Sequence, residues 1–394
     1  MTHAHYLFLE PVDVLFLRTN KSFGDPGSFG ESMVPPWPSV VAGAIRSRIL
    51  ADSDIDLHAF AQNRKTHPEL GTPGQPGSFR LLALQLAMRT PDGSVEPLYP
   101  VPADLMVERS PQGHLRAFYS RPVRLNDGLR SSSLLPLHPV MAQTKRSKPL
   151  GGLWLTAAGW RKYLAGEGPD TSEFVSGATL WEKDPRIGIG LSPITRSVEE
   201  GRLFTAEAVA FRQSIHGGNG HSAGLLTAVS GAMPPSSGLV RLGGDGRAAA
   251  IHAVQSLSAP EPDLAAIAKS RRCRLVLATP GIFEGGWIPD GVARANGTFQ
   301  FDLHGVRGRL VAAAVGRFEV VSGWDLAREQ PKPARRAAPT GSVYWLDQLE
   351  TDERSLRTLL ANGLWPEPCP DPHRRAEGFN RIWIAPWTGA NQGE

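Results

Sequence analysis

The stretch that decides the fold is Leu303–Trp345, LHGVRGRLVAAAVGRFEVVSGWDLAREQPKPARRAAPTGSVYW. Its apolar run, residues 310–321, ends at the corner sequence SGWD (322–325), and a second β-rich run starts at Ser342. Between the two runs, a proline-broken loop carries three cations: Lys332, Arg335 and Arg336. Fixed positive charge beside an aromatic side chain suits phosphate chains and stacked bases. The stretch therefore predicts two strands of a sheet whose edge presents a cationic surface.

The composition is that of a globular protein rich in turns. The chain of 394 residues is long enough for two domains of ordinary size, each with its own core. An apolar content of 41% and a charged content of 20% are typical of soluble proteins. With 42 glycines and 34 prolines, many short strands and long irregular connections are expected, and a helical bundle is not.

Arginine supplies most of the positive charge. The chain has 34 arginines and eight lysines, and its formal net charge is only +4. The planar guanidinium group binds phosphates and base edges better than the lysine ammonium group does. The same richness in arginine follows from GC-rich coding, and the sequence does not separate the two explanations.

Several classes of protein are excluded. Cys273 and Cys369 lie far apart without a CxxC partner, which argues against a zinc site and against a secreted disulfide scaffold. The apolar N-terminus contains Glu10 and Asp13, so neither a signal peptide nor a membrane span is expected there. We therefore expect a cytoplasmic protein with no membrane partner, no metal and no cofactor.

The first half is expected to open with a strand at Tyr6–Leu17 and a helix that ends near Ala51. The PPWP sequence at 35–38 stiffens the chain before this helix, and Ser39 is its expected N-cap. One side has the apolar spacing of a sheet-facing surface: Val41, Ala44, Ile45 and Ile49. The other side carries Ser39, Gly43, Arg46 and Ser47. Gly43 either lets a phosphate backbone approach closely or packs the helix tightly on the sheet.

The remaining elements lead to a fold prediction. Strands are expected at 80–88, 99–107, 201–211, 225–230, 274–278 and 379–384, a hairpin at 239–254, and helices at 154–164, 263–270 and 352–361. Each half then reads strand, helix, strands, helix, strand, which is the order of the ferredoxin-like fold. We predict an α+β protein with two ferredoxin-like (RRM-like, split βαβ) domains and long loop insertions. Their bounds would be 1–165, with an irregular insertion at about 108–152, and 171–394.

No complete catalytic motif is found. LGGDGR (242–247) resembles the metal-binding turn of nucleotide cyclases and polymerases, but Gly246 stands where the second carboxylate is required. A hairpin turn with Arg247 at its rim is predicted instead. His216 and His221 share a glycine loop without a nearby cysteine or carboxylate, so a flexible loop is favoured over a metal site. Walker A and HExxH motifs are absent from the sequence.

Two further features allow contact with nucleic acid. RIGIG (186–190) is too short for a dinucleotide fingerprint, and its glycines could bring the backbone near a nucleic-acid strand. Trp287 and Trp324 lie next to glycines, and each either stacks on a base or packs at a corner of the core.

Nine stretches, in one order, span nearly the whole chain: EPVDVLFLR (10–18), PPWPSVVAGAIRS (35–47), RIGIGL (186–191), EGRLFT (200–205), LGGDGR (242–247), TPGIFEGGWIP (279–289), SGWD (322–325), PKP (331–333) and GSVYW (341–345). This ordered set resembles the RAMP-superfamily subunit that caps the crRNA 5′ end in Cmr-type (type III-B) CRISPR effector complexes, the third Cmr subunit. One departure is the loop at 377–383, which keeps only Gly378 where such subunits have a glycine-rich loop.

The resemblance implies a non-catalytic subunit with two ferredoxin-like domains. Such a subunit holds the repeat-derived 5′ tag of the guide RNA, docks the large palm-domain subunit, and abuts a backbone RAMP subunit of the Cmr complex. The residues expected to contact RNA are Arg18, Lys21, Ser39, Gly43, Arg46, Arg186, Arg196, Arg202, Arg247, Lys332, Arg335 and Arg336.

Two alternatives stay open at this point. One is a metal-independent endoribonuclease of the same superfamily that cleaves repeat RNA, for which His216 and His221 are the candidate residues. The other is a protein scaffold that touches RNA only incidentally.

Overall fold

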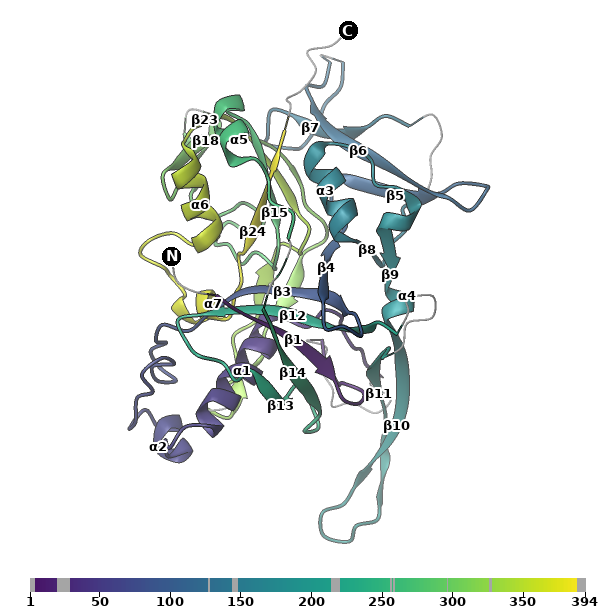
Figure 1. Ribbon diagram of the computed structural model, residues 1–394, viewed down its shortest axis with the longest axis vertical. Coiled ribbons are helices and arrows are strands. Elements are labelled where there is room, and N and C mark those ends of the chain that lie inside the picture. Colours follow the sequence, from purple (N-terminus) through teal and green to yellow (C-terminus); the bar gives the residue numbers. More distant parts are fainter. Residues whose placement is uncertain are drawn as a thin grey trace. The chain divides into compact units, whose positions relative to one another are not determined.

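The computed structural model describes residues 4–19, 29–126, 128–143, 148–213, 220–255, 257, 259–295, 297–325 and 328–387. In this part of the chain the fold is mixed α and β, with mostly antiparallel sheets and few helices, which agrees with the α+β class (Figure 1). None of the helices described is long and apolar enough to cross a membrane.

The chain forms two compact units from interleaved segments. Unit one consists of residues 1–97, 177–257 and 320–334, and unit two of residues 98–176, 258–319 and 335–394. The predicted linker at 166–170 lies within unit two. The division into domains 1–165 and 171–394 stays a prediction.

The main sheet of unit one is antiparallel. In spatial order its strands are β13 (Ser237–Arg241), β14 (Ala248–Val254), β1 (His5–Pro11), β12 (Ser222–Ser230) and β3 (Arg80–Arg89), followed by the start of β4 (Val95–Pro100). Strand β1 lies between β14 and β12, so that Leu7 pairs with Ala253 on one side and with Thr227 on the other. Every residue of β12 is buried, as its unbroken small and apolar sequence predicts.

Helix α1 (Pro38–Ala51) packs on this sheet through Val41, Ala42, Ile45 and Ile49, which are all buried. Its N-cap is Trp37, and no side chain caps it. The prediction that Ser39 is the N-cap is therefore wrong: Pro38 has a fixed φ and no N–H to satisfy, so the helix starts two residues earlier than predicted. A short helix, α2 (Leu57–Ala61), follows and is capped by Asp56.

A second sheet of unit one consists of β10 (Trp181–Leu191), β11 (Val198–Phe211) and the short β2 (Phe29–Gly30). Strands β10 and β11 form a long hairpin that projects beyond the other strands of its unit (Figure 1). Helix α4 (Gly177–Leu180) precedes it. The strand pair β20 (Trp324–Asp325) and β21 (Gln330–Pro331) also belongs to unit one.

The main sheet of unit two is antiparallel, and its inner strand β15 (Cys273–Leu277) is buried on both faces. The strands of this sheet are, in order, β16 (Val292–Ala295), β17 (Thr298–Leu303), β18 (Val306–Ala314), β23 (Val343–Glu350), β15 and β24 (Ile382–Pro386). Alternate residues of β15 enter different cores: Cys273 and Leu275 lie in one, Val276 in the other. A short strand, β19 (Glu319–Val321), follows β18, and β22 (Arg335–Ala337) precedes β23.

Helices cover the two faces of this sheet. Helices α5 (Leu264–Ser270) and α6 (Glu353–Asn362) contribute buried leucines and isoleucine to one core. Their caps are Asp263 and Asp352, and helices at these positions were predicted from the sequence. Helix α3 (Ala157–Ala165) supplies Trp160 and Tyr163 to the core on the other face. It lies between strand β8 (Leu153–Leu155) and, after a 3-10 turn at Thr171–Glu173, strand β9 (Phe174–Ser176).

The segment predicted to be an irregular insertion, 108–152, is ordered in large part. Its strands β6 (Leu115–Val123) and β7 (His138–Met141) form an antiparallel sheet with β5 (Leu105–Arg109). The inner face of this sheet packs on the α3 side of the main sheet of unit two through Leu105, Val107, Ala117 and Tyr119. Alternate residues of β5 are buried against this core, so the segment shares the core of the main sheet.

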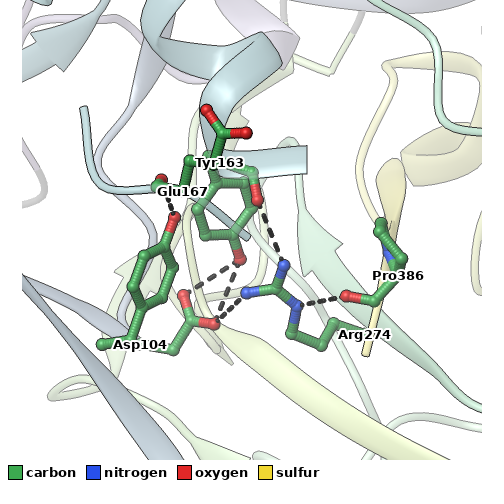
Figure 2. A network of polar contacts seen from close by, with 6 residues as sticks. Asp104, Tyr163, Glu167, Arg274 and Pro386 are labelled. Atoms are coloured by element: carbon green, nitrogen blue, oxygen red, sulfur yellow. Dashed lines mark hydrogen bonds and ion pairs between the residues drawn. The ribbon is translucent and has the colours of Figure 1, made fainter. Parts of the chain in front are cut away.

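A buried ion pair joins this added layer to the main sheet of unit two (Figure 2). Nη1 of Arg274, on β15, lies 2.7 Å from Oδ2 of Asp104, and the two side chains are 7% and 1% exposed. The hydroxyl group of Tyr163 donates to the same carboxylate at 3.0 Å, and the guanidinium group lies 4.4 Å from the Tyr163 ring centroid. Nε of Arg274 donates to the carbonyl oxygen of Pro386. Burial raises the pKa of Tyr163 well above its ordinary value, so Tyr163 stays a donor.

The loop at 377–383, whose reduced glycine content was noted in the sequence, is an internal connection. Asn380 is fully buried with φ 61°. Its Oδ1 accepts from the backbone N–H of Ile282 at 2.6 Å, and its Nδ2 donates to the carbonyl oxygen of Ile282 at 3.2 Å. Helix α7 (Pro372–Ala376) precedes the loop. The loop thus fastens the segment that carries TPGIF (279–283).

Replacing Asp104 by asparagine should destabilise the protein by about 3 kcal/mol, because it leaves the Arg274 charge buried without its counterion. Chemical denaturation of the full chain measures this change. Asp302→Asn is the matched control, since its partner Arg307 lies 3.1 Å away but both side chains are more than 60% exposed. The control should change stability by about 0.5 kcal/mol or less. Equal effects of the two variants would contradict the role given to the buried pair.

Asn380→Ala should cost about 2–4 kcal/mol, because it removes two buried hydrogen bonds and places an alanine in the left-handed region. Glycine adopts the left-handed conformation without strain, so Asn380→Gly loses only the hydrogen bonds. This variant should therefore be about 1 kcal/mol more stable than Asn380→Ala. Denaturation midpoints of the two variants and the parent chain test this order. A glycine variant less stable than the alanine variant would contradict it.

Candidate nucleic-acid interface

Residues 14–19, here called the hub segment, connect three parts of unit one. Leu15 exchanges two backbone hydrogen bonds of 2.8 Å with Val209 of β11. The end of the hub segment pairs with residues 31–33, just ahead of α1, through bonds of 2.9 and 3.1 Å. Arg18 lies in this ladder, bridged to Ser32, with an exposed side chain. Lys21 lies outside the described residues.

The turn between β13 and β14 packs on the hub segment. The N–H of Gly244 donates to the carbonyl oxygen of Phe16 at 2.9 Å. Gly243 has φ 79°, and a Cβ there would lie 2.7 Å from the same oxygen, so no other residue fits. The turn places the guanidinium group of Arg247 over the Phe16 ring, at 5.5 Å from the ring centroid. Nη1 of the same group lies 2.5 Å from the carboxylate of Asp13. The predicted hairpin with Arg247 near its rim is confirmed.

The glycines of RIGIG make room for side chains of the neighbouring strand. A Cβ on Gly188 would lie 2.3 Å from the Phe204 ring, and one on Gly190 would lie 2.7 Å from Cβ of Arg202. Phe204 and the stem of Arg202 therefore lie flat across β10. The interpretation that these glycines expose the backbone to nucleic acid is wrong, because side chains cover them. One face of the hairpin consequently carries an aromatic ring beside arginine.

The predicted arginines of the hairpin are spread along its length. Arg186 lies opposite Ala206 of β11, which pairs on its other side with Gly30 of β2. Nε and Nη2 of Arg186 both donate to Oδ2 of Asp184, at 3.0 and 2.9 Å. Arg202 lies 2.7 Å from Glu199. Arg196 is exposed in the loop at the tip, with φ 54°.

The outer side of α1 is open, as a binding surface requires. Gly43 is exposed, and a Cβ added to it would meet nothing within 4 Å. The alternative that Gly43 packs the helix tightly on the sheet is therefore wrong. Ser39 and Arg46 are partly buried at helical spacing from Gly43, which places all three on one side of the helix. Arg48, on the neighbouring face, is bound to Asp52 and donates to the carbonyl oxygen of Leu239.

The cationic loop of the opening stretch is divided between the two units. Lys332 belongs to unit one, where its N–H donates to the carbonyl oxygen of Gly323 at 2.8 Å and its side chain is partly buried. Trp324, in the same strand pair, is 55% exposed, so its indole is available for stacking. Arg335 and Arg336 are exposed residues of unit two.

In unit two, Arg335 and Arg336 line a groove of about 1040 Å³. Arg294 and Asp290 contribute to the same groove. The guanidinium group of Arg336 lies 4.9 Å from the Phe318 ring centroid. Burial raises the pKa of Asp290, whose carboxylate accepts from the N–H of Glu284 at 3.0 Å. Planar cations near an aromatic ring and a polar wall can hold a base or a phosphate.

A metal site is not found among the described residues: no group of three histidine, cysteine, aspartate or glutamate side chains could hold an ion. His216 lies outside these residues, so its pairing with His221 is not described. Asp245, the acidic residue of the LGGDGR turn, has φ 55° in a turn built around Gly243. The site as described offers guanidinium cations, aromatic rings and backbone polar groups, and groups of these kinds bind nucleic acid.

Two features of this interface were missed in the sequence. One is Phe204, whose position over Gly188 could have been foreseen from a glycine-rich strand facing an aromatic one. The other is the set of carboxylates that pair with the arginines. Asp13 and Arg247 are separated by 234 positions, so no local pattern indicates their contact.

Comparison with known proteins identifies the family of the chain. The family model described as CRISPR-associated protein (Cas_Cmr3) matches residues 7–387. No curated protein matches the chain. Among solved structures, it is similar to a chain of the type III-B Cmr-beta complex bound to cognate target RNA and AMPPnP, with 13% identity, TM-score 0.43 and 86% of each chain covered. A chain of Cmr-beta bound to cognate target RNA has 14% identity and TM-score 0.40, covering 87% of this chain and 86% of that one. The family match over nearly the whole length shows that the chain belongs to the Cas_Cmr3 family of CRISPR-associated proteins and is a Cmr-type effector-complex subunit.

Proposed function

We propose that this subunit binds the guide RNA of its effector complex and holds the repeat-derived 5′ tag without cutting it. The observation that carries the proposal is the hub segment. It brings Arg18, the Arg247 turn, the start of α1 and the base of the β10–β11 hairpin to one strand of unit one. Arginine beside aromatic rings binds both the phosphates and the bases of single-stranded RNA.

Each unit is proposed to be a ferredoxin-like domain. In unit one the strands adjacent in space are β14, β1, β12 and β3, with α1 between β1 and β3 along the chain. In unit two they are β24, β15, β23 and β18, with α6 between β23 and β24. Numbered along the chain, both sets have the order 4-1-3-2, all antiparallel, which is the strand order of the ferredoxin-like fold.

The partners proposed for the subunit follow from its family. Besides crRNA, they are the large palm-domain subunit and the adjoining backbone RAMP subunit of the Cmr complex, in the cytoplasm. The proposal includes no membrane partner, cofactor or metal. It also holds that the subunit is not an enzyme, since the interface offers binding groups in place of a general acid and base.

Binding of tagged RNA tests the proposal. Arg18→Ala, Arg46→Ala and Arg247→Ala should each weaken binding of a 5′-tagged guide by roughly 3- to 30-fold and lower the salt slope by about one unit. Fluorescence anisotropy over a salt series measures both quantities. Arg307→Ala, which removes an exposed, ion-paired arginine of unit two, is the control.

Unchanged affinity in all three variants would contradict the proposed interface. The same RNA, incubated with the protein without metal and separated by size, should remain uncut. Site-specific fragments that disappear in a His221→Ala variant would favour the endoribonuclease alternative. The absence of any binding of RNA to this chain, measured by crosslinking in the assembled complex, would favour the scaffold.

Substitutions at Gly43 separate packing from binding. Gly43→Ala should stabilise the chain by about 0.5–1 kcal/mol, because an exposed helical glycine is replaced where the added Cβ meets open space. The affinity for tagged RNA should fall from glycine to alanine to leucine, since each larger side chain keeps the RNA backbone farther from α1. Thermal melting and anisotropy on the same samples measure the two effects. Full affinity in Gly43→Leu would remove this helix face from the interface.

A further inference from the structure

Three of the arginines proposed to contact RNA already have a carboxylate partner in their own chain. Arg186 is paired with Asp184, Arg202 with Glu199, and Arg247 with Asp13. The N···O distances are 2.9, 2.7 and 2.5 Å. A surface built only to attract phosphate would carry unpaired cations at these positions.

The carboxylates occupy donors that a phosphate could use. Both Nε and Nη2 of Arg186 donate to one oxygen of Asp184, and this side edge is one that guanidinium uses for phosphate. Asp13 meets Nη1 of Arg247 while the guanidinium group lies over Phe16. A phosphate can bind at these positions only by displacing an anion or by approaching one.

The pairs are exposed enough to reach a ligand. The side chains of Asp13, Asp184 and Glu199 are 60%, 40% and 30% exposed. Exposed ion pairs are weak, so the carboxylates oppose phosphate without blocking it. A guanidinium group beside a carboxylate offers hydrogen-bond donors and acceptors side by side. The edge of a base also presents donors and acceptors, whereas a phosphate group presents acceptors only.

We propose that Asp13, Asp184 and Glu199 are specificity-determining residues that make this interface discriminate between base edges and bare phosphate chains. The inference rests on the proposed function, which it deepens: the three arginines read bases of the guide, and their carboxylate partners reject RNA that offers only its backbone. The ligand chemistry is thus a single-stranded RNA segment with unstacked bases.

The test uses the purified full chain and two ligands of equal length, a 5′-tagged guide RNA and an abasic ribose-phosphate oligomer that has no bases. Asp13→Asn, Asp184→Asn, Glu199→Gln and the triple variant keep the shape of each side chain and remove its charge. Each single change should raise the affinity for the abasic oligomer by about two- to fivefold, and the triple variant by more than tenfold. The affinity for the tagged guide should rise less or fall, so that the ratio of the two affinities decreases.

Asp302→Asn in unit two is the control, because it removes an exposed carboxylate from an arginine outside the interface. A rise in affinity for the abasic oligomer as large in Asp302→Asn as in the other variants would show a general charge effect and overturn the proposal. Unchanged affinity for the abasic oligomer in the triple variant would overturn it as well. The measurements with the abasic oligomer test the carboxylates alone, whereas failure of the parent chain to prefer the tagged guide would count against the proposed function.

Discussion

The interface of unit one depends on the backbone pairing of the hub segment. Residues 14–19 are hydrogen-bonded to β11, to the chain ahead of α1 and to the β13–β14 turn, so elements from distant parts of the sequence are held at one strand. The turn reaches this strand only because Gly243 has no side chain in the space that the carbonyl oxygen of Phe16 fills. Backbone hydrogen bonds thus position the chain segments that carry Arg18 and Arg247.

Arginines and carboxylates have different roles in the two units. In unit two, Arg274 and Asp104 are buried together with Tyr163, where the pair joins an added three-stranded layer to the main sheet. In unit one, the pairs at Arg186, Arg202 and Arg247 are partly exposed and lie beside aromatic or open surface. Burial makes the first pair a structural connection, while exposure leaves the other three exchangeable. The same chemistry thus serves stability in one place and recognition in the other.

Much of the fold was predictable because it is locally encoded. The helix at 38–51, the caps Asp263 and Asp352 and the hairpin around LGGDGR follow from spacing, capping residues and turn residues within a few positions of each other. The predicted cap at Ser39 was wrong by two positions because Pro38 is favoured at the helix start and has no N–H to cap. The segment at 108–152 was misjudged because the core on which its strands pack belongs to another part of unit two.

By itself, the sequence determined the α+β class, the helices with their own start signals, and the family, through nine short stretches in a characteristic order. Only the tertiary structure decided that Gly43 faces open space, that Phe204 and Arg202 cover the glycines of RIGIG, and that Asp13 pairs with Arg247. The physical reason is the range of the interactions. Helix caps and turns act over a few residues, whereas the partner of a side chain across a sheet is set by strand register and by chain segments hundreds of positions away.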